Sequence, residues 1–235
     1  MKFLYRPAKD RIQKQDDWKK SAYAFVPFQT NFGELCGFAD DVVNAAKGFG
    51  MHPHENMEIT TIVLRGKQAH KDNTGSQGEL DANSIQTMSA GTGIMHSEYN
   101  ASETSSFHSF QIWVYPKTMN VKPRYGKFTF LPPEKVNKVL LAISPNGNAN
   151  SATINQDAFF SVCQLEAGRQ ITYKMNMDNN GVYIHCAEGN IEIDTYNLLS
   201  GDALGVYDAE SVVIKASQTS ELIFVEVPMT KGIKL

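Results

Sequence analysis

The chain has 235 residues, 42% of them hydrophobic, which is enough to bury one large β domain or two domains of ordinary size. Its net charge of -3 and isoelectric point near 6.1 leave no basic surplus to neutralise phosphates, so we expect neither nucleic-acid binding nor attachment to an anionic membrane. The short N-terminal apolar stretch is broken at Arg6 and charges follow, which fits neither a secretory signal nor a membrane span. We therefore expect a soluble, cytoplasmic protein.

The three cysteines stand far apart, at Cys36, Cys163 and Cys186. They are odd in number and form no C-x-x-C pair, so the sequence predicts neither a disulfide framework nor a zinc knuckle. We expect buried free thiols.

Turn signals separate many short apolar or alternating runs, the pattern of an all-β sandwich or barrel, and helical periodicity is scarce. In chain order the predicted strands of the first half are ITTIVL, residues 68–72, SIQTMS, IMHSEYN and FHSFQIWVY. Glycine-containing turns lie between several of them. Repeated hairpins of this kind favour a closed or jelly-roll barrel, because closure removes exposed strand edges.

Prolines and lysines concentrate between Pro116 and Pro133, and we place the domain boundary there, with one domain at 1–130 and a second at 131–235. The strand rhythm then resumes in KVLLAIS, AFFSVCQLEAG, ITYKMNM, VYIHCAEG, IEIDTYNLL, SVVIKAS and ELIFVEV. ITTIVLRG in the first half and GVYIHCAEG in the second, each followed by a hairpin, indicate a weak internal duplication. The sequence therefore predicts two β-barrels rather than one.

The stretch GMHPHENMEITTIVLRG, residues 50–66, places His52 and His54 one residue apart at the head of an apolar run. Side chains alternate faces along a strand, so the two rings point the same way and can converge on one metal ion. An isolated pair fits a surface location equally well. His96 and Glu98, in GTGIMHSEYN, form a second pair on a shared strand face. Together the pairs offer three imidazoles and a carboxylate, a set that suits iron, manganese, nickel, copper or zinc.

These two stretches resemble the two sequence motifs of the cupin superfamily, with Gly93, His96 and Asn100 in register in the second. More narrowly, HPH with E-I-T, AHKDNTG, MSAGTGIMHSEYN and QIWVYP together resemble the pirin family of bicupins. The resemblance implies an all-β bicupin, two jelly-roll β-barrels packed together, with a metal site in the first barrel. Carried over residue by residue, the implied ligands of one divalent ion are His52, His54, His96 and Glu98. Iron(II) is the favoured ion, with manganese, nickel, copper or zinc as alternatives.

The general cupin pattern takes its carboxylate from the first motif, where Glu58 matches. Along an unbroken strand Glu58 would lie roughly 13 Å beyond His54, at about 3.3 Å per residue, whereas Glu98 would lie within one strand repeat of His96. We therefore predict Glu98 as the ligand. A β-bulge after His54 would bring Glu58 closer, so Glu58 stays a candidate to touch the ligands or to line the pocket.

Other residues near the motifs receive smaller roles. Gln111, inside FQIWVY, is expected either to face the metal cavity or to bond the backbone, and Met51 and Met95 are candidates to line the pocket. His70 and Asp72 match the H-x-D of the resembled family, and we expect a structural turn contact there rather than catalysis.

The second half lacks the ligands. ITYKMNM and GDALGVYDAES stand where the two motifs would run, and His185 is a lone histidine in a strand, so we expect it to be buried and hydrogen-bonded. The C-terminal barrel is therefore predicted to be degenerate and metal-free.

Four protein ligands on an ion that accepts six leave room for a substrate and dioxygen. A carboxylate beside the ion can accept a substrate proton, the catalytic role predicted for Glu98. Members of the resembled family cleave the flavonol quercetin with dioxygen, and others are redox-sensitive regulators that bind partner proteins. We predict a quercetin 2,3-dioxygenase-like oxidoreductase that acts on a small aromatic substrate with O2. The alternative is a non-catalytic, iron-binding regulator with a protein partner, and an open, apolar first barrel would favour the enzyme.

Overall fold

The computed structural model of the chain, which describes residues 1–82 and 84–235, consists of three β-sheets. Its only helical segments within those residues are three short 3-10 turns, at Ala8–Asp10, Pro132–Lys135 and Asn148–Asn150. None of the helical segments in the described part of the chain has the length and hydropathy that crossing a bilayer requires. The prediction of an all-β chain with little helix is confirmed.

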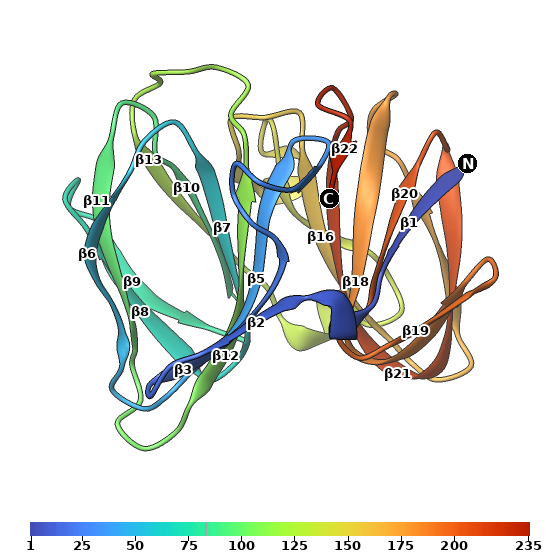
Figure 1. Cartoon of the computed structure of the whole chain (residues 1–235), viewed down its shortest axis with the longest axis horizontal. Coiled ribbons are helices and arrows are strands. Elements are labelled where there is room, and N and C mark those ends of the chain that lie inside the picture. Colours follow the sequence, from blue (N-terminus) through green and yellow to red (C-terminus); the bar gives the residue numbers. More distant parts are fainter. Residues whose placement is uncertain (83) are drawn as a thin grey trace.

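Two sheets form the N-terminal half, on the left of Figure 1. The large N-terminal sheet contains, in spatial order, β13 (Arg124–Thr129), β10 (Ser84–Ser89), β7 (Glu58–Arg65), β12 (Phe107–Val114), β5 (Leu35–Val43), β3 (Lys19–Phe25) and β2 (Ile12–Gln15), with β4 (Asn31–Phe32) and β22 (Ile233–Lys234) at its margin. The small sheet contains β6 (Gly48–His54), β11 (Ile94–Asn100), β8 (Lys67–Asp72) and β9 (Gln77–Asp81).

One sheet forms the C-terminal half, on the right of Figure 1. Its order is β1 (Lys2–Arg6), β20 (Ala203–Tyr207), β18 (Asn180–Ile193), β21 (Ser211–Pro228), β16 (Phe159–Leu165), β14 (Leu140–Ser144) and β15 (Ala152–Thr153), with β17 (Gln170–Lys174) on β21 and β19 (Tyr196–Leu199) on β18. The long strands β18 and β21 change register at several points. The bicupin architecture is as predicted, although its sheets stay open rather than closing into cylinders.

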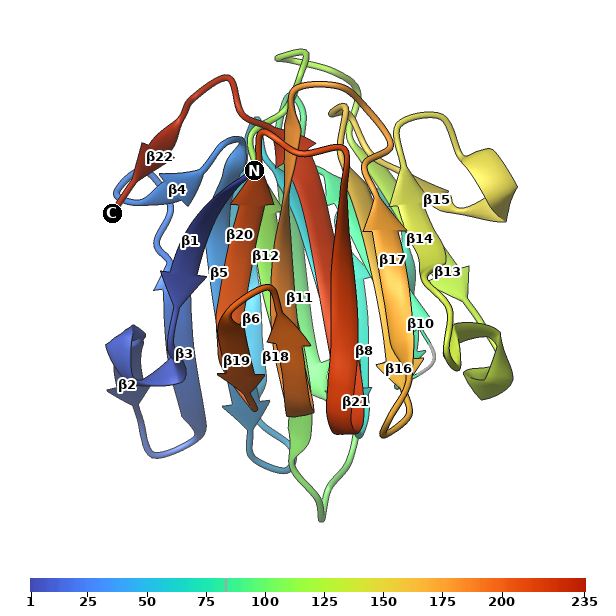
Figure 2. The ribbon, with the colours of Figure 1, turned by 90° about the vertical axis from the view of Figure 1, so that its right-hand side faces the viewer.

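The two ends of the chain cross between the halves (Figure 2). β1 pairs with β20 in the C-terminal sheet, whereas β22 pairs with β4 beside the large N-terminal sheet. Each half thus includes a strand from the far end of the sequence. The predicted boundary after residue 130 falls between β13 and the 3-10 turn at Pro132–Lys135.

The large N-terminal sheet has apolar packing on one face and a cavity on the other. Alternation along β12 sends Phe110 and Ile112 towards the C-terminal sheet and turns Gln111 and Trp113 the opposite way. The interface is apolar and aromatic, with fully buried rings such as that of Tyr183 from β18. The C-terminal half also has an apolar interior of its own, which contains the buried free thiols of Cys163 and Cys186.

A buried polar chain crosses this interface beside the aromatic rings. Arg11 donates to Nδ1 of His185 at 3.0 Å and to the carbonyl of Gly201, and it pairs with Asp40 at 3.2 Å. Asp40 in turn bonds His108 at 2.6 Å. Burial lowers the pKa of His185 well below its usual range, and the charges of Arg11 and His108 lower it further. His185 is therefore a neutral hydrogen-bond acceptor. The prediction that this lone histidine is buried and hydrogen-bonded is confirmed.

This neutral histidine makes stability depend on pH. Above the unfolded pKa of about 6.5, neither state binds the proton, whereas below it the unfolded chain binds a proton that folded His185 refuses. Stability therefore falls as the pH drops from 6.5. His185→Gln keeps an acceptor for Arg11 but cannot titrate, so its stability should fall less steeply, by about 1.4 kcal/mol per pH unit. Urea unfolding at several pH values between 7.5 and 5, on proteins in the same metal state, checks this. Parallel curves for the parent and the variant would contradict it.

Candidate metal centre and adjoining cavity

Three histidines meet where two strands of the small sheet run side by side. β6 and β11 are antiparallel neighbours, and their register sets His96 directly opposite His52, with Ile94 opposite His54. The ring centroids of His52 and His96 lie 4.3 Å apart, and the ring of His54 lies 4.9 Å from each. One ligand nitrogen from each of the three lies within 4.8 Å of the others. The structure thus brings the two predicted histidine positions of β6 together with that of β11.

Glu98 joins this cluster through His96. A register shift between His96 and Glu98 places Glu98 opposite Phe49 on β6, and on its other side Glu98 pairs with His70 of β8. The ligand atoms of His70, His96 and Glu98 also lie within 4.8 Å of one another. The four predicted ligands therefore occur as two overlapping groups that share His96, and His70 belongs to the second.

His70 also makes the turn contact that the sequence predicted. Its Nε2 lies 3.3 Å from Oδ2 of Asp72, and Oδ1 of Asp72 accepts the backbone N–H groups of Thr74 and Ser76. Tyr125 stacks on the His70 ring with centroids 4.9 Å apart. These contacts fix the ring beside the cluster, a position that the sequence pattern alone did not indicate.

A ring of neutral donors holds the Glu98 carboxylate. Gln111 donates to Oε2 at 2.8 Å, whereas Gln68 at 2.6 Å, Thr61 at 3.3 Å and Gln86 at 3.4 Å face Oε1. Sequence reasoning identified only Gln111 among them. The sequence feature that could have identified another donor is a polar residue at an inward position of an otherwise apolar strand, such as Thr61 in ITTIVL.

The chemistry of the histidines fits a divalent transition metal ion. His96 is fully buried, and neither ring nitrogen has a hydrogen-bond partner within the described chain. Burial, reinforced by neighbouring imidazoles, lowers the pKa of His96 to about 3 and that of His54 to about 4. Nδ1 of His52 faces the Gly50 carbonyl at 2.7 Å, so it acts as the donor and Nε2 keeps its lone pair. The neutral rings of His54 and His96 have lone pairs available at pH 7, as a metal requires.

Glu58 lies apart from the cluster. The chain leaves β6 at His54, turns through Asn56 in a left-handed conformation (φ 48°) and starts β7 at Glu58 in the other sheet, so no unbroken strand joins the two residues. Oε2 of Glu58 accepts the Ser89 hydroxyl at 2.7 Å and the backbone N–H of Asn155 at 3.0 Å. Burial raises the pKa of Glu58. Its carboxylate joins the two halves of the chain and does not line the cavity beside the histidines.

Met51 and Met95 require a correction, because they do not line the pocket. They alternate with His52 and His96 along β6 and β11, so they lie on the outer face of the small sheet, 49% and 36% exposed.

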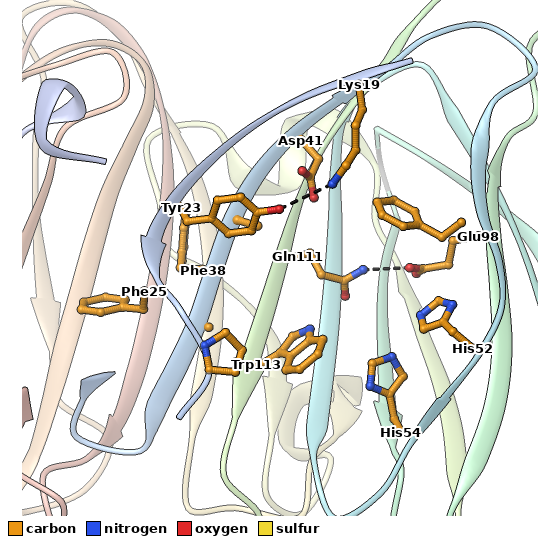
Figure 3. A pocket seen from close by; sticks show the side chains of 14 residues that line it. Lys19, Tyr23, Phe25, Phe38, Asp41, His52, His54, Glu98, Gln111 and Trp113 are labelled. Carbon is orange, nitrogen blue, oxygen red and sulfur yellow. Dashed lines mark hydrogen bonds between the residues drawn. The ribbon is translucent and has the colours of Figure 1, made fainter. Parts of the chain in front are cut away.

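A cavity of about 300 Å³ extends from the histidines between the two N-terminal sheets (Figure 3). Its walls are largely apolar and include several aromatic rings, with Trp113 beside His54 at a centroid distance of 4.9 Å. Gly37 lets this indole approach, because a Cβ there would lie 2.9 Å from Cβ of Trp113. The lining is completed by Lys19, Tyr23, Phe25, Pro27, Phe38, Ala39, Asp41, Phe49, His52, Glu98 and Gln111. Such a size and lining suit a small aromatic ligand.

Family models, related proteins and a solved structure match this chain over most of its length. Residues 6–114 match the family model described as Pirin, and residues 141–227 match the one described as Quercetinase C-terminal cupin domain. A protein of Escherichia coli K12 named quercetin 2,3-dioxygenase is 34% identical over 215 residues, 91% of each chain. A pirin-like protein of Caulobacter vibrioides is 35% identical over 216 residues, 89% of this chain and 92% of its own. The solved structure of the bacterial pirin YhhW of Escherichia coli in complex with nickel(II) has a TM-score of 0.89 at 33% identity and covers 97% of this chain and 99% of its own.

Metal titration tests the predicted ligands individually. The parent should bind one nickel(II) ion per chain. His52→Ala and His96→Ala should each weaken nickel binding by more than about 100-fold, because loss of a ligand costs more affinity than loss of a residue that only hydrogen-bonds a ligand. Met51 lies next to His52 on β6 but on the outer face of the sheet, so Met51→Ala should leave the nickel affinity unchanged. Isothermal titration calorimetry gives both the affinity and the stoichiometry. Two ions in the parent, or undiminished binding by the histidine variants, would contradict the assignment.

Proposed function

Because the chain belongs to the pirin family, we propose that it is a metal-dependent dioxygenase that cleaves a flavonol such as quercetin with dioxygen. His52, His54, His96 and Glu98 would hold one divalent transition metal ion in the N-terminal half, and iron(II) is the ion we favour. The observation that carries the proposal is the aromatic-lined cavity that begins at His52, His54 and Glu98. The relative from Escherichia coli named quercetin 2,3-dioxygenase supports the same substrate class.

The proposed ion supplies Lewis acidity towards a substrate hydroxyl and the redox activity that dioxygen chemistry requires. The protein positions the substrate through its aromatic side chains. Trp113 lines the cavity from β12 of the large sheet, edge-on to His54, and Phe49 lines it from β6 of the small sheet. A flat ring between such walls is held by apolar burial and oriented by ring contacts.

Glu98 is the proposed acceptor of the substrate proton. Three donors engage Oε1 from outside the cavity lining, and Gln111, itself a lining residue, is the donor on Oε2. Oε2 is therefore the oxygen nearer the substrate, and Gln111 fixes its direction. Proton transfer to a fixed carboxylate needs no reorganisation at the moment of reaction, which is the advantage of this arrangement.

The cavity favours the enzyme over the alternative of a purely regulatory metalloprotein. A regulator that acts through surface loops has no need for an aromatic chamber beside the ion. The chamber in this chain has both the size and the lining for a substrate, so the catalytic function is the one we propose.

Oxygen uptake with quercetin tests the proposal, with carbon monoxide measured as the second product. The metal-loaded parent should consume oxygen. Glu98→Gln should retain the size of the side chain and an oxygen ligand but lose the basic charge, so turnover should fall by about 100-fold or more, the usual scale for loss of a general base. Glu58→Gln is the matched control, a buried carboxylate outside the cavity, and should cost less.

Two results would contradict this assignment. A large loss in Glu58→Gln with Glu98→Gln unaffected would move the base to the first-motif carboxylate. No turnover in the parent with iron, nickel, manganese, copper or zinc would overturn the dioxygenase function.

A further inference from the structure

At the end of the cavity remote from His54, three polar side chains have no role in the proposed reaction. Lys19 and Tyr23 of β3 and Asp41 of β5 line the cavity there, and Figure 3 shows them on the opposite side of the chamber from His54. The three side chains come from neighbouring strands, because Tyr23 pairs with Ala39 and Ser21 pairs with Asp41. We refer to Lys19, Tyr23 and Asp41 as the polar end.

The strand register sets the distance between the polar end and the metal side. Ala39 pairs with both Tyr23 and Gln111, so β5 separates the strand of Tyr23 from the strand of Gln111. Two strand spacings amount to about 10 Å. Gln111 bonds Glu98, which places the polar end one further side chain away from the carboxylate. An elongated molecule of linked aromatic rings can span this distance, whereas a single small ring cannot.

The Lys19 ammonium is held by neutral groups. Its Nζ donates to Ser21 Oγ at 3.1 Å and to Tyr23 Oη at 3.5 Å, both neutral, and it lies 4.9 Å from the centroid of the Phe49 ring. Within the described residues, the ion pairs at 4.0 Å or less do not include it. An ammonium group has three N–H donors, so one remains for a ligand.

Asp41 supplies the complementary acceptor. It is 6% exposed, and the Ser21 hydroxyl donates to its Oδ1. Ser21 thus links Lys19 to Asp41, and it holds the ammonium and the carboxylate at the cavity wall. A buried carboxylate beside an ammonium gives the polar end one acceptor and one strong donor side by side.

This pairing discriminates among ligand groups. A ligand carboxylate would meet the like charge of Asp41, and a bare hydrocarbon ring would leave Lys19 and Asp41 desolvated without partners. A hydroxyl group can accept from Lys19 and donate to Asp41, and two adjacent hydroxyls can do both at once. We propose that the polar end is a specificity subsite for the hydroxylated pendant ring of a polyphenol whose other end reaches the metal side. This inference rests on the proposed function and names the substrate class more narrowly.

Binding without turnover tests the subsite. Nickel-loaded protein under argon is titrated with quercetin, whose pendant ring carries two adjacent hydroxyls, and with galangin, whose pendant ring carries none but is otherwise the same. Quenching of tryptophan fluorescence reports binding, because Trp113 lines the cavity. The parent should bind quercetin at least about tenfold more tightly, the contribution of one or two hydrogen bonds to charged groups.

Lys19→Met and Asp41→Asn should bring the two affinities to within about threefold of each other, mainly by weakening quercetin, because each removes one of the two groups that the ligand hydroxyls are proposed to engage. Lys20→Met is the matched control, because Lys20 is the next residue of the same strand and is exposed. It should preserve the parent's ratio. Asp41→Asn keeps the size of the side chain, so it keeps the test valid if Lys19→Met fails to fold.

The outcomes separate this inference from the proposed function. Equal affinities in the parent, or a ratio that survives in both variants, would overturn the subsite even if oxygen uptake is observed. A ratio that collapses as expected in a protein that consumes no oxygen would retain the subsite and overturn the dioxygenase. Failure of the parent to bind either flavonol would overturn both.

Discussion

The structure depends on face-to-face packing between the large N-terminal sheet and the C-terminal sheet. Phe38 and Phe110 from one side meet Tyr183 and His185 from the other, with ring centroids 5.0 to 5.4 Å apart across the interface. Burial of these rings removes a large apolar area from water and supplies most of the driving force for the contact. Because every second residue of β5 and β12 is anchored there, the intervening residues are held in fixed positions on the opposite face. Those residues include Ala39, Asp41, Gln111 and Trp113, the walls of the cavity.

The two halves share a strand architecture but have opposite interiors. The apolar core of the C-terminal half consists of aliphatic and aromatic side chains such as Ile184, Leu204 and Phe224. The N-terminal interior instead holds three clustered histidines, of which His96 is fully buried, and the buried Glu98, whose carboxylate accepts hydrogen bonds from amide and hydroxyl donors. Burying such groups costs stability unless each is hydrogen-bonded or bound to a metal. Both ring nitrogens of His96 lack protein partners in the described chain, so the metal would complete this arrangement.

The sequence predicted the class of fold and the location of the site well, for physical reasons. Period-two alternation and glycine turns identify β-strands locally, and the H-x-H and H-x-E spacings identify residues that share a strand face. The structure brings His52, His54 and His96 together as that reasoning required, and Glu98 joins them through His96. The exchange of β1 and β22 between the halves was not predicted, because pairing between distant ends of the chain leaves no local pattern.

Other features depended on register and sheet membership, which local patterns do not determine. Met51 and Met95 were expected in the pocket, yet strand parity turns them to the outer face once His52 and His96 face inward. Gln68 and Gln86 reach Glu98 only because β8 of the small sheet and β10 of the large sheet come together in the folded chain, and nothing in their own strands indicates that partner. Lys19, Tyr23 and Asp41 were missed for the same reason, since they belong to strands that carry no recognisable motif.

The central claim is that one metal ion is held in the N-terminal interior beside the aromatic cavity, and none in the C-terminal interior. Anomalous X-ray diffraction at the nickel absorption edge, from crystals of the nickel-loaded chain, tests it most directly. The account predicts a single peak per chain, within about 2.0 to 2.2 Å of nitrogens of His52, His54 and His96 and of a Glu98 oxygen, the usual range for such ligands. A peak in the C-terminal half, or one that excludes Glu98 in favour of His70, would contradict it.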